Sequence, residues 1–224
     1  GTFLRKWGVP GHNSGELDGP AGMRFDSNGI LVVAESRNHR VQKFTRDGAT
    51  VGSFGSEGTG PGQFNIPFGI HIDNRDNIFV ADWGNNRVQK FSSKGEFLSQ
   101  FGSSGSGTGE LSKPTATATD AEGDVYIADW GNNRVQVYSP EGEFITSFHG
   151  DARELSESAL QFVQANPDMV KARKRADTSL EWTFRRPIAV AVDKQNRLLV
   201  LESISGRIQV YQKEEDYDDP QFNL

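Results

Sequence analysis

The nine-residue sequence ADWGNNRVQ occurs twice in this chain, at residues 81–89 and again at residues 128–136. It belongs to a longer unit whose third element recurs as RVQKF at 40–44 and 87–91, RVQVY at 134–138 and RIQVY at 207–211. A second marker keeps a constant spacing of 47 residues, as WG at 7–8, FG at 54–55, FG at 101–102 and FH at 148–149. The last RVQ-type element comes 73 residues after the third, so about 26 residues are inserted after Phe148. Such self-similarity indicates a repeat architecture in which each unit packs on its neighbours.

Each unit has the pattern of four short antiparallel strands. An apolar strand that ends in Asp follows a proline, and a tight turn leads to a second strand, as in PFGIHID followed by NIFVAD. The turn needs a left-handed backbone, which suits the residues found there, Gly29, Asp76, Gly123 and Asn196. RVQKF supplies the third strand, and EFLSQFG supplies the fourth. Four sequential strands with Gly-rich joins predict an all-β fold, a β-propeller of four-stranded antiparallel blades.

The third strand raises one difficulty. Val88 and Phe91 are three residues apart, so a regular strand cannot place both side chains on one face. We therefore expect a bulge or an early strand end that redirects one of them.

These residues resemble the NHL repeat, whose pattern is P-x-G-I-x-x-D, then I-x-V-A-D-x-x-N-x-R-V-Q-x-F, then G-x-F-x-x-x-F-G. Repeats two and three match this pattern closely, and the resemblance covers nearly all of the chain except 150–180 and the tail. The first and fourth repeats depart from it, with VAESRNHR and VLESISGR in place of the D-x-G-N-x-R turn. The resemblance implies a propeller, which in this family usually has six blades, whereas four repeats are present here.

The phase of the repeat predicts how the ring closes. The chain starts with an outer-strand motif, GTFLRKWG, and its last repeat stops after the third strand. We therefore expect residues 2–8 to pair with 207–212 and complete the last of four blades, which removes an exposed sheet edge. A cut at the same phase from a longer ring would leave the same pattern. The predicted domain spans 1–213, with a helical insertion at about 151–180 between the third and fourth repeats, and an acidic tail at 214–224.

Strand directions place the ADWGNNR turns, the Gly-rich crossovers and the insertion on one face of the propeller. At the turns, the Asp, Asn and Arg residues have a structural explanation in hydrogen bonds and ion pairs. Trp83 and Trp130 have two competing explanations, because a large aromatic residue at a polar turn either anchors a partner or covers the adjacent blade. Arg37 and His39 occupy the corresponding turn of the first repeat and are predicted to bind the partner as well.

The insertion is predicted to form two helices. Its first half has apolar residues at helical spacing, namely Leu155, Ala159, Leu160, Phe162 and Val163. In the second half, Asn166 suits an N-cap and Pro167 the first helical position. The second helix carries a basic run, which is either a solvated face or a partner-binding surface, made of Lys171, Arg173, Lys174 and Arg175.

Composition narrows the functional classes. The chain has no Cys and only four His, of which His71 is predicted to lie on an inner strand. No catalytic, metal-binding or cofactor-binding residues are predicted, and a lack of enzymatic activity is favoured. The favoured function is a non-catalytic module that binds a protein or peptide through the Trp-bearing face. The alternatives are a single-stranded RNA-binding propeller, which the net charge of −6 disfavours, and a channel-centred metal-dependent lyase or hydrolase. No membrane span is expected, and the sequence assigns neither a compartment nor an oligomeric state.

Overall fold

The computed structural model describes residues 1–150, 157–176 and 178–213, and the expected acidic tail lies outside them. Three antiparallel sheets have four strands in sequential order, and a fourth sheet has three. Blade 1 comprises β1 (Pro20–Phe25), β2 (Leu31–Glu35), β3 (Arg40–Phe44) and β4 (Thr50–Phe54). Blade 2 comprises β5 (Pro67–Ile72), β6 (Ile78–Asp82), β7 (Arg87–Phe91) and β8 (Phe97–Phe101). Blade 3 comprises β11 (Pro114–Thr119), β12 (Val125–Asp129), β13 (Arg134–Tyr138) and β14 (Phe144–Phe148). Blade 4 comprises β15 (Pro187–Val192), β16 (Arg197–Glu202) and β17 (Arg207–Gln212).

The remaining elements are short. The two Trp turns each contain a 3-10 helix, η1 (Trp83–Asn85) and η2 (Trp130–Asn132), and β9 (Ser103–Ser104) pairs in parallel with β10 (Glu110–Leu111). The insertion contains α1 (Glu157–Gln164), α2 (Pro167–Arg175) and α3 (Ser179–Trp182). In the described part of the chain, no helix is long and apolar enough to cross a membrane.

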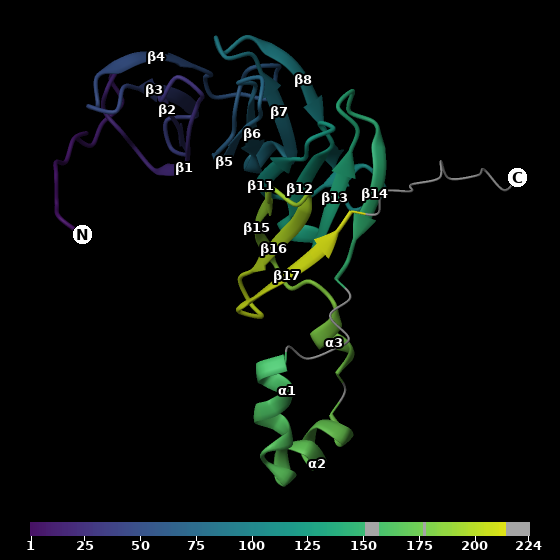
Figure 1. The fold of residues 1–224 in the computed structure, drawn as a ribbon. Coiled ribbons are helices and arrows are strands. Elements are labelled where there is room, and N and C mark those ends of the chain that lie inside the picture. The colour runs from purple at the N-terminus through teal and green to yellow at the C-terminus, as the bar shows by residue number, and fades with distance from the viewer. Residues whose placement is uncertain (151–156, 177, 214–224) are drawn as a thin grey trace, which may run out of the picture.

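The blades form an open arc, and the expected closure by the N-terminal strand is wrong for this structure. Residues 2–8 form no strand, and no described strand pairs with the outer edge of β17. The physical reason is that Trp7 packs on Phe44 of blade 1, with ring centroids 5.0 Å apart. This contact fixes the N-terminal segment at one end of the arc, whereas β17 lies at the other (Figure 1).

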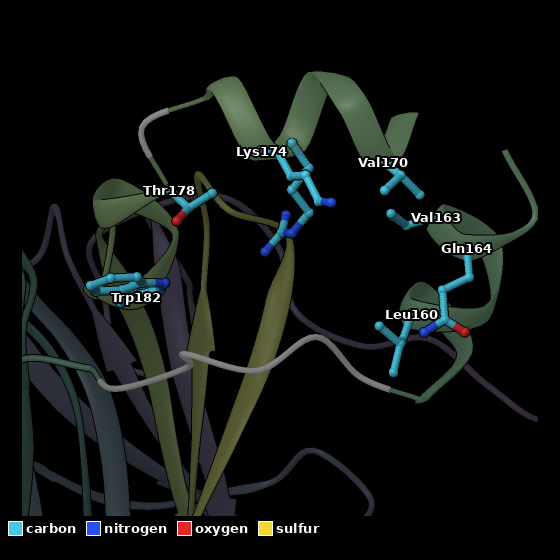
Figure 2. Close-up of a pocket in the computed structure, with 8 residues that line it drawn as sticks. Leu160, Val163, Gln164, Val170, Lys174, Thr178 and Trp182 are labelled. Carbon is cyan, nitrogen blue, oxygen red and sulfur yellow. The ribbon is translucent and has the colours of Figure 1, made fainter. Parts of the chain in front are cut away.

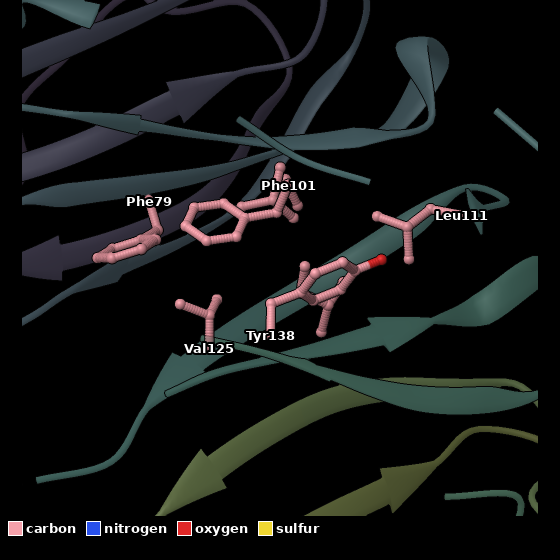
Figure 3. Close-up of a cluster of buried hydrophobic side chains, with 8 residues drawn as sticks. Phe79, Phe101, Leu111, Val125 and Tyr138 are labelled. Carbon is pink, nitrogen blue, oxygen red and sulfur yellow. The ribbon is translucent and has the colours of Figure 1, made fainter. Parts of the chain in front are cut away.

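Each internal blade is buried on both faces. Val88 of β7 packs towards blade 3 with Phe101 and Tyr138, whereas Phe91 of the same strand packs towards blade 1 with Phe64. The expected bulge is present between β7 and β8, at Lys90/Phe91. It is not needed to redirect Val88 or Phe91, because opposite faces of the strand are both in the core. Figure 3 shows the cluster between blades 2 and 3.

The predicted tight turns are confirmed. Gly29, Asp76, Gly123 and Asn196 all have a positive φ. In each turn the Asp that ends the first strand accepts hydrogen bonds from backbone N–H groups two and four residues later, as Asp73 does from Arg75 and Asn77. The chain therefore reverses direction through an Asp-anchored turn between the first and second strands of each blade.

A buried carboxylate links the second strand of every blade to the crossover that precedes that blade. In blade 2, the Asp82 carboxylate accepts from the backbone N–H of Asn65 at 2.7 Å and from Arg87 Nε at 2.9 Å. The Arg87 guanidinium then donates to the carbonyls of Gly60 and Gln63 in the crossover. The same arrangement is built by Glu35 with Arg40, by Asp129 with Arg134 and by Glu202 with Arg207. The structural explanation of these turn residues is therefore confirmed.

One buried hydroxyl offers a test of the packing. Thr117 lies in β11, and its Oγ1 has no hydrogen-bond partner among the described residues. Since repeats one, two and four have apolar Met23, Ile70 and Val190 at this position, Thr117→Val should raise the free energy of unfolding by about 1 kcal/mol. Urea denaturation measures the change.

Thr115→Val is the matched control, because the Thr115 hydroxyl donates to the carbonyl of Pro187 at 3.3 Å. It should be neutral or destabilising. Equal effects of the two changes would contradict the assignment of an unpaired hydroxyl to Thr117.

Candidate partner-binding face

The Trp turns and the crossovers lie on one face, as the strand directions predicted. The backbone N–H of Gly84 in η1 donates to the carbonyl of Asn65, and that of Gly131 in η2 donates to the carbonyl of Ser112, each at 2.8 Å. The insertion starts and ends at the same face, because the N–H of Phe184 donates to the carbonyl of His149 at 2.7 Å. Figure 1 shows α1 and α2 projecting away from the blades beyond this face.

Trp83 and Trp130 are half-buried, and each ring is stacked against a cation of the next blade. Lys113 Nζ lies 4.8 Å from the centroid of the Trp83 ring, and Arg186 Cζ lies 4.0 Å from that of Trp130. Both cations precede the proline that begins the first strand of a blade. The structure therefore gives both tryptophans a role between blades, and it leaves part of each ring at the surface.

The corresponding turn of blade 1 has neither partner. Ser36 stands at the Trp position, and Ile66 stands at the position of the stacked cation. His39 makes the link to the next blade instead, since its Nδ1 accepts from the backbone N–H of Ile66 at 3.3 Å, as Asn86 Oδ1 does from Lys113. Arg37 is exposed and pairs with Asp18 at 3.1 Å.

Arg37 and His39 lie apart from the predicted site residues of the insertion. Blade 1 lies at the far end of the arc from the helices (Figure 1). The turn with Trp130 lies beside the two ends of the insertion, because a polar pocket of about 360 Å³ is lined by Asn132 of the turn and by His149 and Arg185, which flank the insertion.

The second helix of the insertion begins at the predicted residue. The Asn166 side chain accepts from the backbone N–H groups of Asp168 and Met169, and Pro167 is the first residue of α2. The expected first helix is present as α1, but Leu155 lies outside the described residues. The sequence did not indicate the short α3, which returns the chain to blade 4.

The three helices enclose an open groove of about 450 Å³. Figure 2 shows Val163 of α1 beside Val170 of α2, Leu160 further along α1, and Trp182 of α3 on the opposite side of the groove. Arg173 and Lys174 of α2 also line the groove. Trp182 was not among the predicted site residues, although an aromatic residue at the C-terminal end of the inserted segment could have indicated a binding anchor.

The basic residues of α2 differ in their ion pairs and in their exposure. Arg173 pairs with Glu181 of α3 at 2.8 Å, and Lys171 lies 3.8 Å from Asp168 of its own helix. Lys171, Lys174 and Arg175 are exposed. Arg207 of β17 donates to the carbonyls of Glu181 and Thr183, so the end of the insertion is anchored to blade 4.

The inner strands place one histidine between neighbouring blades. His71 Nε2 lies 2.9 Å from Thr119 Oγ1 and accepts from the backbone N–H of Thr119 at 3.2 Å. Burial, together with the positive charge of Arg24, lowers the pKa of His71 to about 4, against a smaller opposite effect of Asp73. His71 is therefore neutral at pH 7.

Among the described residues, one group of three carboxylates lies close enough to hold a metal ion, Asp120, Glu122 and Asp124. Lys213 Nζ contacts all three, at 2.7 Å from Asp120 and 2.8 Å from Asp124. Burial opposes the charge of Lys213, but these contacts outweigh it and raise the pKa of Lys213. The three carboxylates thus compensate the positive charge of the Lys213 side chain, which directly follows β17.

The cation stack can be measured by a double-mutant cycle of Trp83→Leu and Lys113→Met. We expect a coupling free energy of about 0.5–1 kcal/mol from chemical denaturation, because the stack lies at a half-exposed site. Ser36→Ala and Ile66→Leu, at the same positions between blades 1 and 2, form the control cycle. Equal coupling in both cycles would contradict a cation–π contribution.

His71 should make stability depend on pH. Its pKa is lower in the folded chain than the usual value of 6.5, so the unfolded chain binds more protons between pH 6.5 and 4. Stability should therefore fall as the pH falls through this window, by about 1–2 kcal/mol after allowance for partial exposure.

His71→Gln keeps an acceptor for the Thr119 N–H and cannot titrate. Urea denaturation at pH 7 and pH 4 should show a smaller loss of stability in this variant than in the wild type. The prediction fails if both proteins lose the same amount.

Comparisons with known proteins agree with this architecture. A family model described as NHL repeat matches residues 17–44, and one described as a 6-bladed beta-propeller matches residues 73–164. The sequence comparison with curated proteins finds no match.

Solved structures with the same fold include a streptogramin B lyase, at 14% identity and a TM-score of 0.58 over 94% of this chain and 59% of that chain. A catalytically inactive virginiamycin B lyase from Staphylococcus aureus with quinupristin matches at 16% identity and a TM-score of 0.55, over 91% of this chain and 57% of that chain. A Bacteroides thetaiotaomicron protein of unknown function matches at 18% identity and a TM-score of 0.56, over 85% of this chain and 46% of that chain. The chain thus spans less than two thirds of these proteins, and such low identity shows the fold alone. The chain contains an NHL repeat and a segment that matches a 6-bladed beta-propeller, which is consistent with the NHL-repeat β-propeller family.

Proposed function

We propose that this chain is a non-catalytic interaction module that binds a protein or peptide partner through the face with the Trp turns and the insertion. The groove between α1, α2 and α3 is the observation that carries the proposal. It is built by an inserted segment that departs from the repeat, and added segments on a rigid scaffold are where binding residues concentrate.

The walls of the groove suit an apolar anchor. Leu160, Val163, Val170 and Trp182 contribute side chains to it, and a partner side chain that enters would bury them further. Exposed Phe162 and Met169 extend the apolar surface of the same helices. Buried aromatic and aliphatic anchors supply most of the free energy of binding in protein interfaces.

The charges at the groove favour an acidic partner segment. Lys174 lines the groove, and Lys171 and Arg175 are exposed on the same helix. The chain as a whole has a net charge of −6, so this basic surface contrasts with its surroundings. A local positive patch steers an acidic segment to one place and raises its association rate.

The Trp turns support RNA binding less well. One face of each Trp ring is already covered by Lys113 or Arg186, which reduces the area on which a base could stack. Lyase activity has no support beyond the fold, because the Nε2 of His71 already accepts a hydrogen bond from the backbone of a neighbouring strand.

Selection from a random peptide library tests the proposal. Peptides that bind the wild-type chain should be enriched in Asp or Glu next to a large apolar residue. Changing Lys171, Lys174 and Arg175 to Glu should weaken their binding at least tenfold, as measured by fluorescence anisotropy, because each reversal replaces attraction by repulsion. A fluorescent oligouridine probe, tested in parallel, measures the RNA alternative.

A variant without the insertion is the control. Gly55 of the FG marker corresponds to His149 of the FH marker, and Phe64 corresponds to Phe184 in the core, so residues 55–64 can replace residues 149–184 at equivalent positions. This variant should keep its β-sheet signal in circular dichroism and lose peptide binding. Peptides that bind it as well as the wild type, or tighter binding of oligouridine than of any peptide, would reject the proposal.

A further inference from the structure

The polar pocket beside the Trp130 turn is more basic than its counterpart between blades 2 and 3. His149, Arg185 and Arg186 line it, and none of the other described residues that line it carries a carboxylate. At the corresponding positions of the counterpart, the chain has Gly102, Ser112 and Lys113. We call this site the basic pocket.

The fold does not require the additional basic residues. The backbone N–H of Arg185 donates to the buried carboxylate of Glu202 at 2.8 Å, as that of Ser112 does to Asp129 at 2.7 Å. The loop is therefore built in the same way with an uncharged residue at this position. Departures from a repeat that meet in one cavity indicate a function that the other repeats lack.

The guanidinium of Arg186 is held in a fixed position. Its Nη1 donates to the carbonyls of Trp130 at 3.2 Å and Gly131 at 3.4 Å, and its Cζ lies 4.0 Å from the centroid of the Trp130 ring. In the described part of the chain, no group accepts a hydrogen bond from its Nε or Nη2. These two atoms form one edge of the guanidinium, and this edge matches two oxygens of a phosphate or carboxylate group.

Asn133 and Arg185 provide further donors. Asn133 Oδ1 accepts from the backbone N–H of Arg186 at 2.9 Å, so the Nδ2 group of this side chain stays available to a ligand. Arg185 is exposed at the wall of the pocket. The two arginines contribute permanent positive charges, which suit an anion with more than one negative charge and several acceptor oxygens. A phosphate monoester has both properties.

The basic pocket is continuous with the groove of the insertion. Trp182 lines the groove, and Thr183, the next residue in the chain, lines the basic pocket. A partner segment that places an apolar residue in the groove therefore passes close to the basic pocket.

We propose that the basic pocket binds the phosphate group of a phosphorylated serine, threonine or tyrosine in the partner segment. This inference rests on the proposed function, and it adds a second anchor to the apolar one. Clusters of arginine recognise phosphorylated peptides in other modules. A phosphodiester of RNA suits the pocket less well, because it carries a single charge and because Arg186 covers the Trp130 face on which an adjacent base would stack.

Peptide arrays test this proposal. Each peptide carries one tryptophan and, at a varied spacing on either side of it, phosphoserine, aspartate or serine. At the best spacing, the wild-type chain should bind the phosphoserine peptide about tenfold or more tightly than the aspartate and serine peptides, as measured by fluorescence anisotropy. Arg185→Ser with Arg186→Lys gives the loop the sequence that precedes blade 3. This variant should lose the preference, because Lys cannot form the bidentate contact.

The reciprocal exchange is the matched control. Ser112→Arg and Lys113→Arg, added to the changes at Arg185 and Arg186, restore the composition and net charge of the wild type but move the arginine pair to the other junction. This variant should lack the preference as well. Circular dichroism checks that both variants fold, which we expect because each loop receives a sequence that the other already accommodates.

Equal binding of the phosphoserine and aspartate peptides, or a preference that survives in either variant, overturns the inference. Equal binding of the phosphoserine and serine peptides also overturns it but leaves the proposed function intact, whereas the absence of binding by every peptide rejects both. Displacement of the phosphoserine peptide by an equal concentration of oligouridine shows an RNA site, and displacement by an equal concentration of inorganic phosphate shows a site for the free ion. Either result overturns the inference.

Discussion

A buried carboxylate at the end of the second strand holds the entry loop of every blade in place. Asp82 and its counterparts are fully buried, and each is neutralised by an Arg that also donates to loop carbonyls. Removing one partner of such a pair costs about 3–5 kcal/mol, because the other charge stays buried without compensation. The loops and Trp turns of the candidate face are therefore fixed before any partner arrives, which reduces the entropy lost on binding.

The same interaction explains how a long insertion is tolerated. In blade 4 the guanidinium of Arg207 reaches the carbonyls of Glu181 and Thr183, which stand where loop carbonyls stand in the other blades. Phe184 then fills the core position that Leu111 and Phe64 fill elsewhere. The helices are thus added to an unchanged frame, and the groove can vary without disturbing the blades.

The sequence was sufficient for the blades, the turns and the position of the insertion, because local spacing determines these features. Asp76 and Asn196, for example, are residue types that tolerate the left-handed turn conformation that they adopt. The closure of the propeller ring could not be predicted from local spacing. The repeat phase identifies residues 2–8 as an outer strand, and the contact of Trp7 with Phe44 agrees with that phase, but phase does not specify which molecule supplies the neighbouring strands. The stacking of Lys113 on Trp83 was also missed, because it joins residues of neighbouring blades that the spacing within one repeat does not relate.

The burial of each blade between two neighbours also determines where the chain opens first. Blades 2 and 3 are covered on both faces, whereas blades 1 and 4 each have a single neighbour. In such nearest-neighbour arrays the free energy of local opening rises from the ends towards the middle. Backbone amides in β6 and β12 should consequently exchange hydrogen more slowly than those in β2 and β16, although all four strands carry the same sequence pattern.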